Sequence, residues 1–189
     1  MSSTGWVVLI IVVVVCIVIA LLIAVGLRPR MRSRQLRERF GPEYDRAVQE
    51  SPDRKTAEQE LTEREKRHDQ LQLRELSDEE KRRYEATWSR IQEQFIDDPA
   101  GALDSADRLV TQAMTDRGYP SQSYDQQLAD LSVEHARPLG QYRTAHDIAA
   151  RAERGSVSTE DMRTAIVHYR ELFADLVDGG NSDSHRSHH

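Results

Sequence analysis

The apolar positions of this chain follow two different patterns. Between Trp6 and Leu27 lie 22 residues without a charged side chain, whereas further along the apolar residues recur three or four positions apart. A helix rises about 1.5 Å per residue and the hydrocarbon core of a bilayer is about 30 Å thick, so the first pattern is long enough to span a membrane. We therefore expect a short N-terminal tail at 1–5 and a transmembrane helix at 6–27, with Trp6 and Leu27 at its ends.

Four arginines follow directly after the apolar run, at Arg28, Arg30, Arg32 and Arg34. An excess of Lys and Arg marks the cytoplasmic side of a span, and each such side chain near the surface gains about 1 kcal/mol from anionic headgroups. We therefore expect a plasma-membrane protein with its N-terminus outside and its C-terminal domain in the cytoplasm. The four arginines would lie among the anionic headgroups of the lipid bilayer.

The apolar run fits an uncleaved anchor better than a signal peptide or a lipoprotein. A cleaved signal has a positively charged start and an apolar stretch of about 7–15 residues, and this N-terminus has neither feature. The single cysteine, Cys16, lacks the small residues that precede a lipoprotein cleavage site, and it permits no disulfide within the chain. We interpret Cys16 as a small apolar membrane residue.

The segment after the arginines is predicted to be helical but poor in apolar residues. In the basic juxtamembrane segment 28–50, apolar residues recur every four positions, and Gly41-Pro42 divides or kinks this helix. Charged and amide side chains dominate 51–76, so we expect a charged helical spacer there, with a weak coiled coil or partial disorder as alternatives. A helix of about 23 residues in this region would hold the next domain about 35 Å away.

From residue 77 onwards the chain shows a succession of amphipathic helices. The first begins with a capping box formed by Ser77 and Glu80. We expect an all-α fold in which 77–177 forms a bundle of four or five short helices, followed by a polar, disordered tail at 178–189. The other predicted helix starts are Asp98-Pro99, Ser123, Arg137-Pro138 and Ser158.

The charge distribution argues against one class of partner. The net charge of the whole chain is −6, but it is unevenly distributed. Residues 28–40 hold six Arg and one Glu, whereas the rest of the chain carries 20 basic and 31 acidic residues. Phosphate binding needs a basic face, so the acidic body argues against nucleic acid. The bilayer accounts for the basic segment, and we expect a protein as the further partner.

The polar residues form no motif typical of catalysis or metal binding. The four histidines before the tail are not spaced as HExxH or HxxxH, which would place two ligands one helical turn apart. The three tail histidines could bind a metal only loosely, and helix capping accounts for the carboxylate pair Asp97-Asp98. Nucleophile elbows, Walker loops and dinucleotide-binding turns are missing as well. We predict no enzyme activity, no catalytic residue, no cofactor and no metal.

Four longer stretches of the sequence are distinctive: RFGPEYDRAV (39–48), RYEATWSRIQEQFIDDPAGALDSADRLVTQAMTDRGYP (83–120), LSVEHARPLGQYRTAHDIAA (131–150) and TEDMRTAIVHYRELFADLV (159–177). Together with the anchor, they resemble a group of uncharacterised bacterial single-pass membrane proteins that are common in actinobacteria. The resemblance implies a cell-membrane location and an all-helical domain, and it supplies no activity. Some proteins of this group are described as secreted, which would conflict with the orientation expected here.

These features predict a membrane-anchored, non-catalytic helical interaction or scaffold module of unknown pathway. The first alternative is a small-ligand binder or enzyme with a pocket between the last helices, near His135, Tyr142, His146 and His168. The second is an envelope-maintenance protein whose domain lies outside the membrane. The apolar face around Trp88 is predicted to be core rather than a peptide-binding groove.

Overall fold

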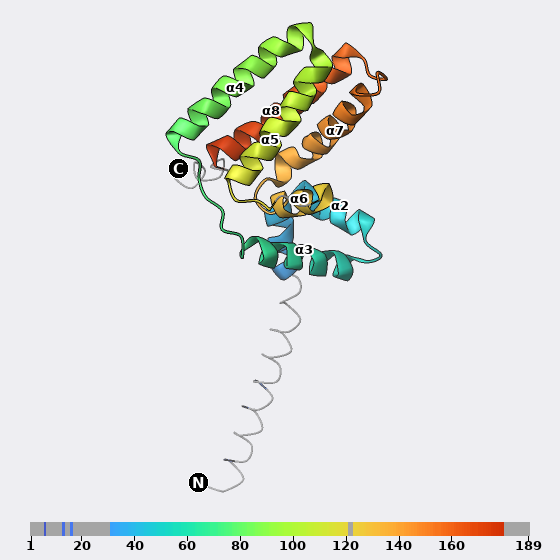
Figure 1. Cartoon of the computed structure of the whole chain (residues 1–189). Helices are drawn as coiled ribbons and strands as arrows, with labels where there is room; N and C mark the ends of the chain where they lie inside the picture. The colour runs from blue at the N-terminus through green and yellow to red at the C-terminus, as the bar shows by residue number, and fades with distance from the viewer. Residues whose placement is uncertain (1–5, 7–12, 14–15, 17–30, 121–122, 180–189) are drawn as a thin grey trace, which may run out of the picture.

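The structure is a computed structural model that describes residues 6, 13, 16, 31–120 and 123–179 (Figure 1). Regular structure throughout these residues is helical, without strands, which confirms the all-α prediction. No helix among them is both long and apolar enough to cross a bilayer. The predicted span at 6–27 lies almost wholly outside the described residues, as does nearly all of the predicted tail.

Three positions of the predicted span are described, and all three are helical: Trp6, Val13 and Cys16. Their side chains are exposed, to 60% for Trp6 and 49% for Val13. These apolar side chains therefore do not pack into the folded part of the chain.

Two helical hairpins packed side by side form a bundle (Figure 1). One hairpin is α4 (Asp78–Asp97) with α5 (Pro99–Asp116), and the other is α7 (Ala136–Ala152) with α8 (Thr159–Asp178). The hairpins meet through α5, which packs against α8 and α7. The short helix α6 (Tyr124–Leu131) lies at the lower end of the bundle in Figure 1, in contact with α7 and with α3 below it.

Most of the bundle helices begin where the sequence predicts. The capping box of Ser77 and Glu80 is complete at the start of α4. The side chains of Ser77, Asp98, Ser123 and Ser158 each accept a backbone N–H in the first turn of α4, α5, α6 and α8 respectively. Helix α7 differs, because it begins at Ala136, just before the predicted Arg137-Pro138, and no side chain caps it.

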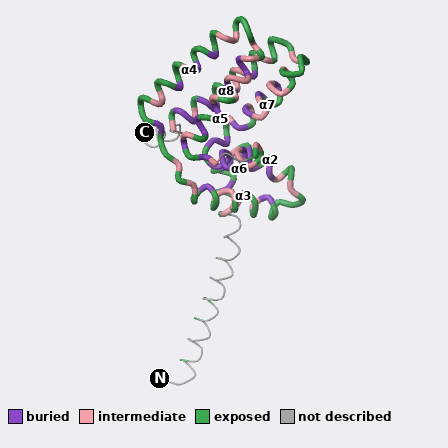
Figure 2. Tube along the Cα trace, viewed as in Figure 1, coloured by how far each residue is buried: buried purple, intermediate pink, exposed green. Residues whose placement is uncertain are grey.

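The inward faces of the bundle helices form one apolar core, and the purple segments of these helices in Figure 2 mark their buried residues. Trp88 stacks on Phe173 with the ring centroids 4.9 Å apart, and Tyr84 lies tilted at 6.3 Å from the same ring. Trp88 is only 3% exposed. The aromatic face of α4 is therefore core, as its spacing predicts.

A smaller unit lies below the bundle, and we call residues 31–68 the base unit (Figure 1). It consists of the helical segment 31–40, α2 (Pro42–Glu50) and α3 (Arg54–His68). Gly41 separates the first two with a φ of 45°, which confirms the predicted break. The unit has its own apolar cluster, which consists of Leu36, Phe40, Tyr44, Ala47, Ala57, Leu61 and, from the segment before α7, Val133.

The packing of α3 differs from the free spacer that the sequence predicts for 51–76. Ala57 and Leu61 are fully buried, and α3 packs against α2 and α6 instead of extending away from the bundle. These two apolar residues, one helical turn apart, join the apolar cluster of the base unit, and ion pairs lie beside them. Glu65 of α3, for example, pairs with Arg32 at 2.7 Å and with Arg39 at 3.2 Å.

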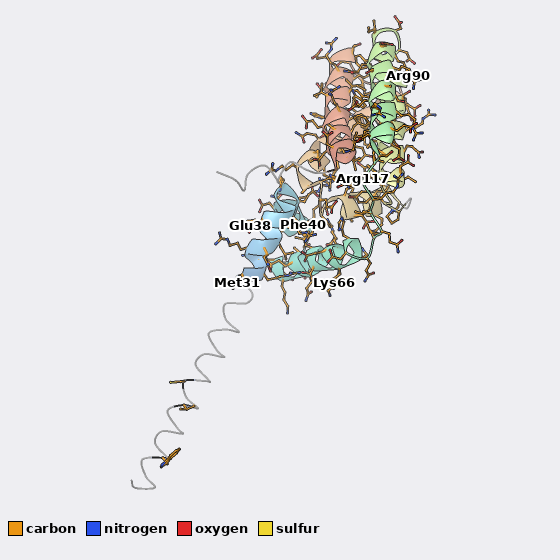
Figure 3. The ribbon with its side chains drawn as sticks, turned by 90° about the vertical axis from the view of Figure 1, so that its left-hand side faces the viewer. Met31, Glu38, Phe40, Lys66, Arg90 and Arg117 are labelled. Carbon is orange, nitrogen blue, oxygen red and sulfur yellow. The ribbon has the colours of Figure 1, made fainter. Side chains whose placement is uncertain are left out.

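The linker from α3 to α4 lies against the end of α5. Gly118 has a φ of 97°, and a Cβ placed on it would lie 2.6 Å from the carbonyl oxygen of Gln72 in the linker. Arg74 N donates to Arg117 O at 2.9 Å. The buried Arg117, labelled in Figure 3, donates in turn to Leu176 O of α8 at 3.0 Å. The linker is thus fixed to the same end of the bundle that faces the base unit.

Candidate functional site

A bidentate ion pair joins the base unit to the bundle. Both terminal guanidinium nitrogens of Arg143 on α7 donate to the carboxylate of Glu43 on α2, at 2.5 and 2.6 Å. The Glu43 side chain is 4% exposed and that of Arg143 is 17% exposed. Removing one partner of a buried pair leaves an uncompensated charge, at a cost of about 3–5 kcal/mol. The pair spans 100 residues of sequence, so no local pattern could have predicted it.

A cluster of five polar side chains lies where the end of α3 meets the bundle, and we call it the histidine corner. The Tyr119 ring contacts two imidazoles, with centroid distances of 6.4 Å to His68 and 6.1 Å to His135. The Tyr119 hydroxyl donates to Glu134 at 3.4 Å, and Asp175 of α8 completes the cluster. Residues from four separate segments therefore meet at this corner.

His135 is oriented by a carboxylate. Its Nδ1 lies 2.6 Å from Asp175 Oδ2, and its side chain is fully buried. Its Nε2 is also buried and has no hydrogen-bond partner. The carboxylate on one ring nitrogen fixes the orientation of the imidazole, and the other nitrogen remains an unsatisfied polar group.

The environment of the corner keeps His68 and Tyr119 neutral. Burial lowers the pKa of His68 below its ordinary 6.5, because the imidazolium form would lose hydration, although Glu134 opposes this shift. The Glu134 carboxylate lies 3.6 Å from His68 Nε2 and is 40% exposed, so its opposing effect is partly screened by water. Burial likewise raises the pKa of Tyr119. Both side chains are therefore uncharged near pH 7.

A second polar cluster surrounds Asp107 on α5. Its Oδ1 accepts a hydrogen bond from the Tyr169 hydroxyl at 3.0 Å and lies 3.1 Å from His146 Nδ1. His146 also stacks on Tyr124, with the ring centroids 4.2 Å apart. The contact with Asp107 raises the pKa of His146, which is opposite to the shift at His68. The Asp107 carboxylate thus connects α5 with α7 and α8, and His146 in turn contacts α6 through Tyr124.

The structure separates the four residues that the sequence analysis placed in one pocket. Tyr142 and His146 lie together, with ring centroids 6.2 Å apart. His135 is eleven positions before His146 in the sequence and lies in the histidine corner. His168 lies on α8, and its buried Nδ1 lacks a hydrogen-bond partner. None of the four lines any of the three cavities described next. In the described structure they do not form one pocket.

The open cavities of the described structure include three that lie between helices. One of about 520 Å³ lies between α4 and α5, and one of about 230 Å³ lies between the base unit and the bundle, beside Glu43 and Arg143. The third, of about 350 Å³, lies between α4 and α8, and we call it the α4–α8 groove.

The α4–α8 groove has an apolar floor and a polar rim. Trp88, Phe173 and Val177 line the floor, and Glu85 and Arg170 stand at the rim. Trp88 Nε1 is buried without a hydrogen-bond partner. The aromatic face of α4 therefore belongs mainly to the core, while one edge of it also forms the floor of a surface groove.

Two of the four arginines predicted to contact headgroups are described, and both have protein partners. Arg32 donates to Glu65 at 2.7 Å and to Thr62 at 3.3 Å, which ties the first helical segment to α3. Arg34 pairs with Glu38 at 2.9 Å and remains 82% exposed. Arg28 and Arg30 lie outside the described residues.

Among the described residues, no group of three or more His, Cys, Asp or Glu side chains is placed to bind a metal ion. No protein-family model matches the chain, and neither a curated protein nor a solved structure is detectably similar to it.

Proposed function

We propose that this chain is a single-pass membrane protein whose helical domain is a non-catalytic interaction module held close to the bilayer. Residues 6–27 would form the anchor, with the N-terminus outside and the domain in the cytoplasm. The observation that carries the proposal is the 22-residue uncharged run followed by arginines. The exposed apolar side chains of Trp6 and Val13 support it, because such side chains need apolar surroundings.

The position of the base unit supports a short distance between domain and membrane. Only residues 28–30 separate the predicted span from Met31, where the base unit begins. Fully extended, this connection reaches about 14 Å. Because α3 packs against the rest of the protein, it does not add the 35 Å of a free spacer.

The distribution of charge is consistent with the same arrangement. The base unit carries ten basic and nine acidic residues, whereas residues 69–179 carry 13 basic and 22 acidic residues. An acidic bundle is repelled by an anionic bilayer, while a nearly neutral base unit beside the arginines is not. This favours an orientation with the base unit toward the membrane and the bundle away from it.

The anchor can be tested with charges placed in the predicted span. An arginine at the centre of a membrane helix costs about 2.5–3.5 kcal/mol, so the double substitution Val13→Arg and Ile17→Arg should release the full-length chain from washed membranes. Val167→Arg is the matched control, because Val167 is 51% exposed on α8 and its substitution should leave the location unchanged. Retention of the double variant in the membrane would contradict the proposed anchor.

The orientation can be tested with reporter fusions at the C-terminus of the full-length chain. A reporter that is active only in the cytoplasm should be active there. Activity of a reporter that works only after export would instead support the envelope-maintenance alternative.

The interaction role can be tested by crosslinking in intact membranes. A photoactivatable residue at Gln92, on the rim of the α4–α8 groove, should crosslink a defined protein. The same residue at Asp147, which is 71% exposed on α7, is the control. Recovery of the same unselective set of membrane proteins from both positions would count against an interaction module with a specific partner.

A further inference from the structure

The contacts between the base unit and the bundle differ in their response to acid. The joint formed by Arg143 and Glu43 contains a guanidinium, which stays charged at any physiological pH. At the C-terminal end of α3, the contact is made by His68, the last residue of the helix. Its side chain is 6% exposed, and its Nε2 is buried without a hydrogen-bond partner. Protonation of this imidazole would place a charge in a buried position.

We propose that His68 is an acid-sensitive latch, which holds the end of α3 and the following linker against the bundle when neutral and releases them when protonated. The inference does not depend on the membrane anchor. It depends on the burial of His68 and on its contact with the opposite unit through Tyr119.

The charged and titratable groups around His68 come from four segments of the chain. Two acidic groups favour its charged form, while a guanidinium and a second imidazole disfavour it. The acidic groups are partly or largely exposed, with 40% exposure for Glu134 and 64% for Asp69, so water screens them. The groups are Arg39 from the first helical segment, Asp69 beside His68, Tyr119 after α5, and Glu134 and His135 before α7.

The direction of the pH effect follows from the lowered pKa of His68. The released imidazole has an ordinary pKa of 6.5, so it binds protons more tightly than the docked one. Docking is therefore at full strength above pH 6.5 and weakens as the pH falls from there through the pKa of docked His68. The contribution of His146 to stability depends on pH in the opposite direction, because its pKa is raised in the folded protein. Protonation of His146 adds stability, and this stability is lost as the pH rises through the raised pKa.

Hydrogen exchange on the full-length chain tests the latch. Between about pH 7.5 and about pH 5, protection of the amides around residues 66–72 should fall about tenfold after correction for the intrinsic rate. Protection in the centres of α5 and α8 should be unchanged. The variant His68→Gln, which stays neutral, should remove the pH dependence around 66–72, whereas His146→Gln should leave it in place.

Two further measurements keep the test decisive if a variant folds poorly. An NMR titration of the wild-type chain should place the pKa of His68 below 6.5. Glu134→Gln removes one group that favours the charged imidazole, so it should increase the loss of protection at acid pH. A pKa for His68 at or above 6.5, or the same acid response in wild type and His68→Gln, would overturn the proposal.

Discussion

The bundle and the base unit are both helical, but different interactions hold them together. The bundle contains 23 buried apolar residues in one cluster, whereas the base unit has seven, including Val133 from outside it. The base unit also has ion pairs such as those of Glu65 with Arg32 and Arg39, but the arginines are over 40% exposed, so each pair contributes at most about 1 kcal/mol. A domain of the bundle's size can bury enough apolar surface to fold alone, whereas a unit of under 40 residues ordinarily cannot. A densely charged segment can thus be a folded part of a protein when its few apolar residues meet a larger neighbour.

The largest expected effect comes from replacing one buried leucine by alanine in each region. Leu172 of α8 and Leu61 of α3 are both fully buried. Leu172→Ala should lower the free energy of global unfolding by about 2–5 kcal/mol, as measured by denaturant titration. Leu61→Ala should instead open the base unit, seen as loss of hydrogen-exchange protection in α3 with α5 and α8 still protected. Equal loss in both regions would show that they unfold as one unit.

The second prediction concerns the ion pair of Glu43 and Arg143, which joins the two regions. Arg143→Met leaves the Glu43 carboxylate buried without its partner, so docking of the base unit should weaken by about 3 kcal/mol. Hydrogen exchange of α2 measures this change. Adding Glu43→Leu removes the unpaired charge and should recover part of the loss. A double variant no more stable than Arg143→Met would contradict the assigned cause.

The linker between the two regions gives the third prediction. Gly118→Ala should destabilise the protein by about 1–3 kcal/mol, because the new Cβ would meet the linker backbone at a positive φ. Thermal unfolding followed by circular dichroism measures it. Gly140→Ala on α7 is the matched control: nothing lies within 4 Å of its Cβ position, so the variant should be neutral or more stable by up to about 1 kcal/mol. Equal effects at both sites would exclude the close contact as the cause.

The smallest effect concerns a single helix of the bundle. Ser77→Ala removes the capping box of α4 and should cost about 1 kcal/mol. Ser89→Ala, at an exposed position within α4, removes only a bond to the helix's own backbone and should change stability much less. Denaturant midpoints of the two variants provide the comparison, and a larger loss for Ser89→Ala would contradict the role of the cap.

The bundle could be predicted from the sequence because capping residues and apolar spacing are local features. Contacts between segments that are distant in sequence could not be predicted in this way. The capping residues Ser77 and Asp98 mark helix starts within a few positions, and the spacing around Trp88 identifies the core face. The packing of α3 depends on Val133 and on the partners of Glu65, which lie far away in sequence. Nothing in the sequence around His135 or His146 indicates which distant carboxylate each imidazole contacts.

The ion pair between Glu43 and Arg143 also bears on how the chain folds during synthesis. Its partners are 100 residues apart, and the second one belongs to the bundle. At a synthesis rate of about 5–20 residues per second, α2 waits about 5–20 seconds for the side chain that completes its contact. During that interval the charged base unit has neither Val133 nor Arg143 to pack against. The scarcity of apolar residues in this waiting segment limits the surface through which it could aggregate. The composition that obscures its fold in the sequence thus has a role before the fold exists.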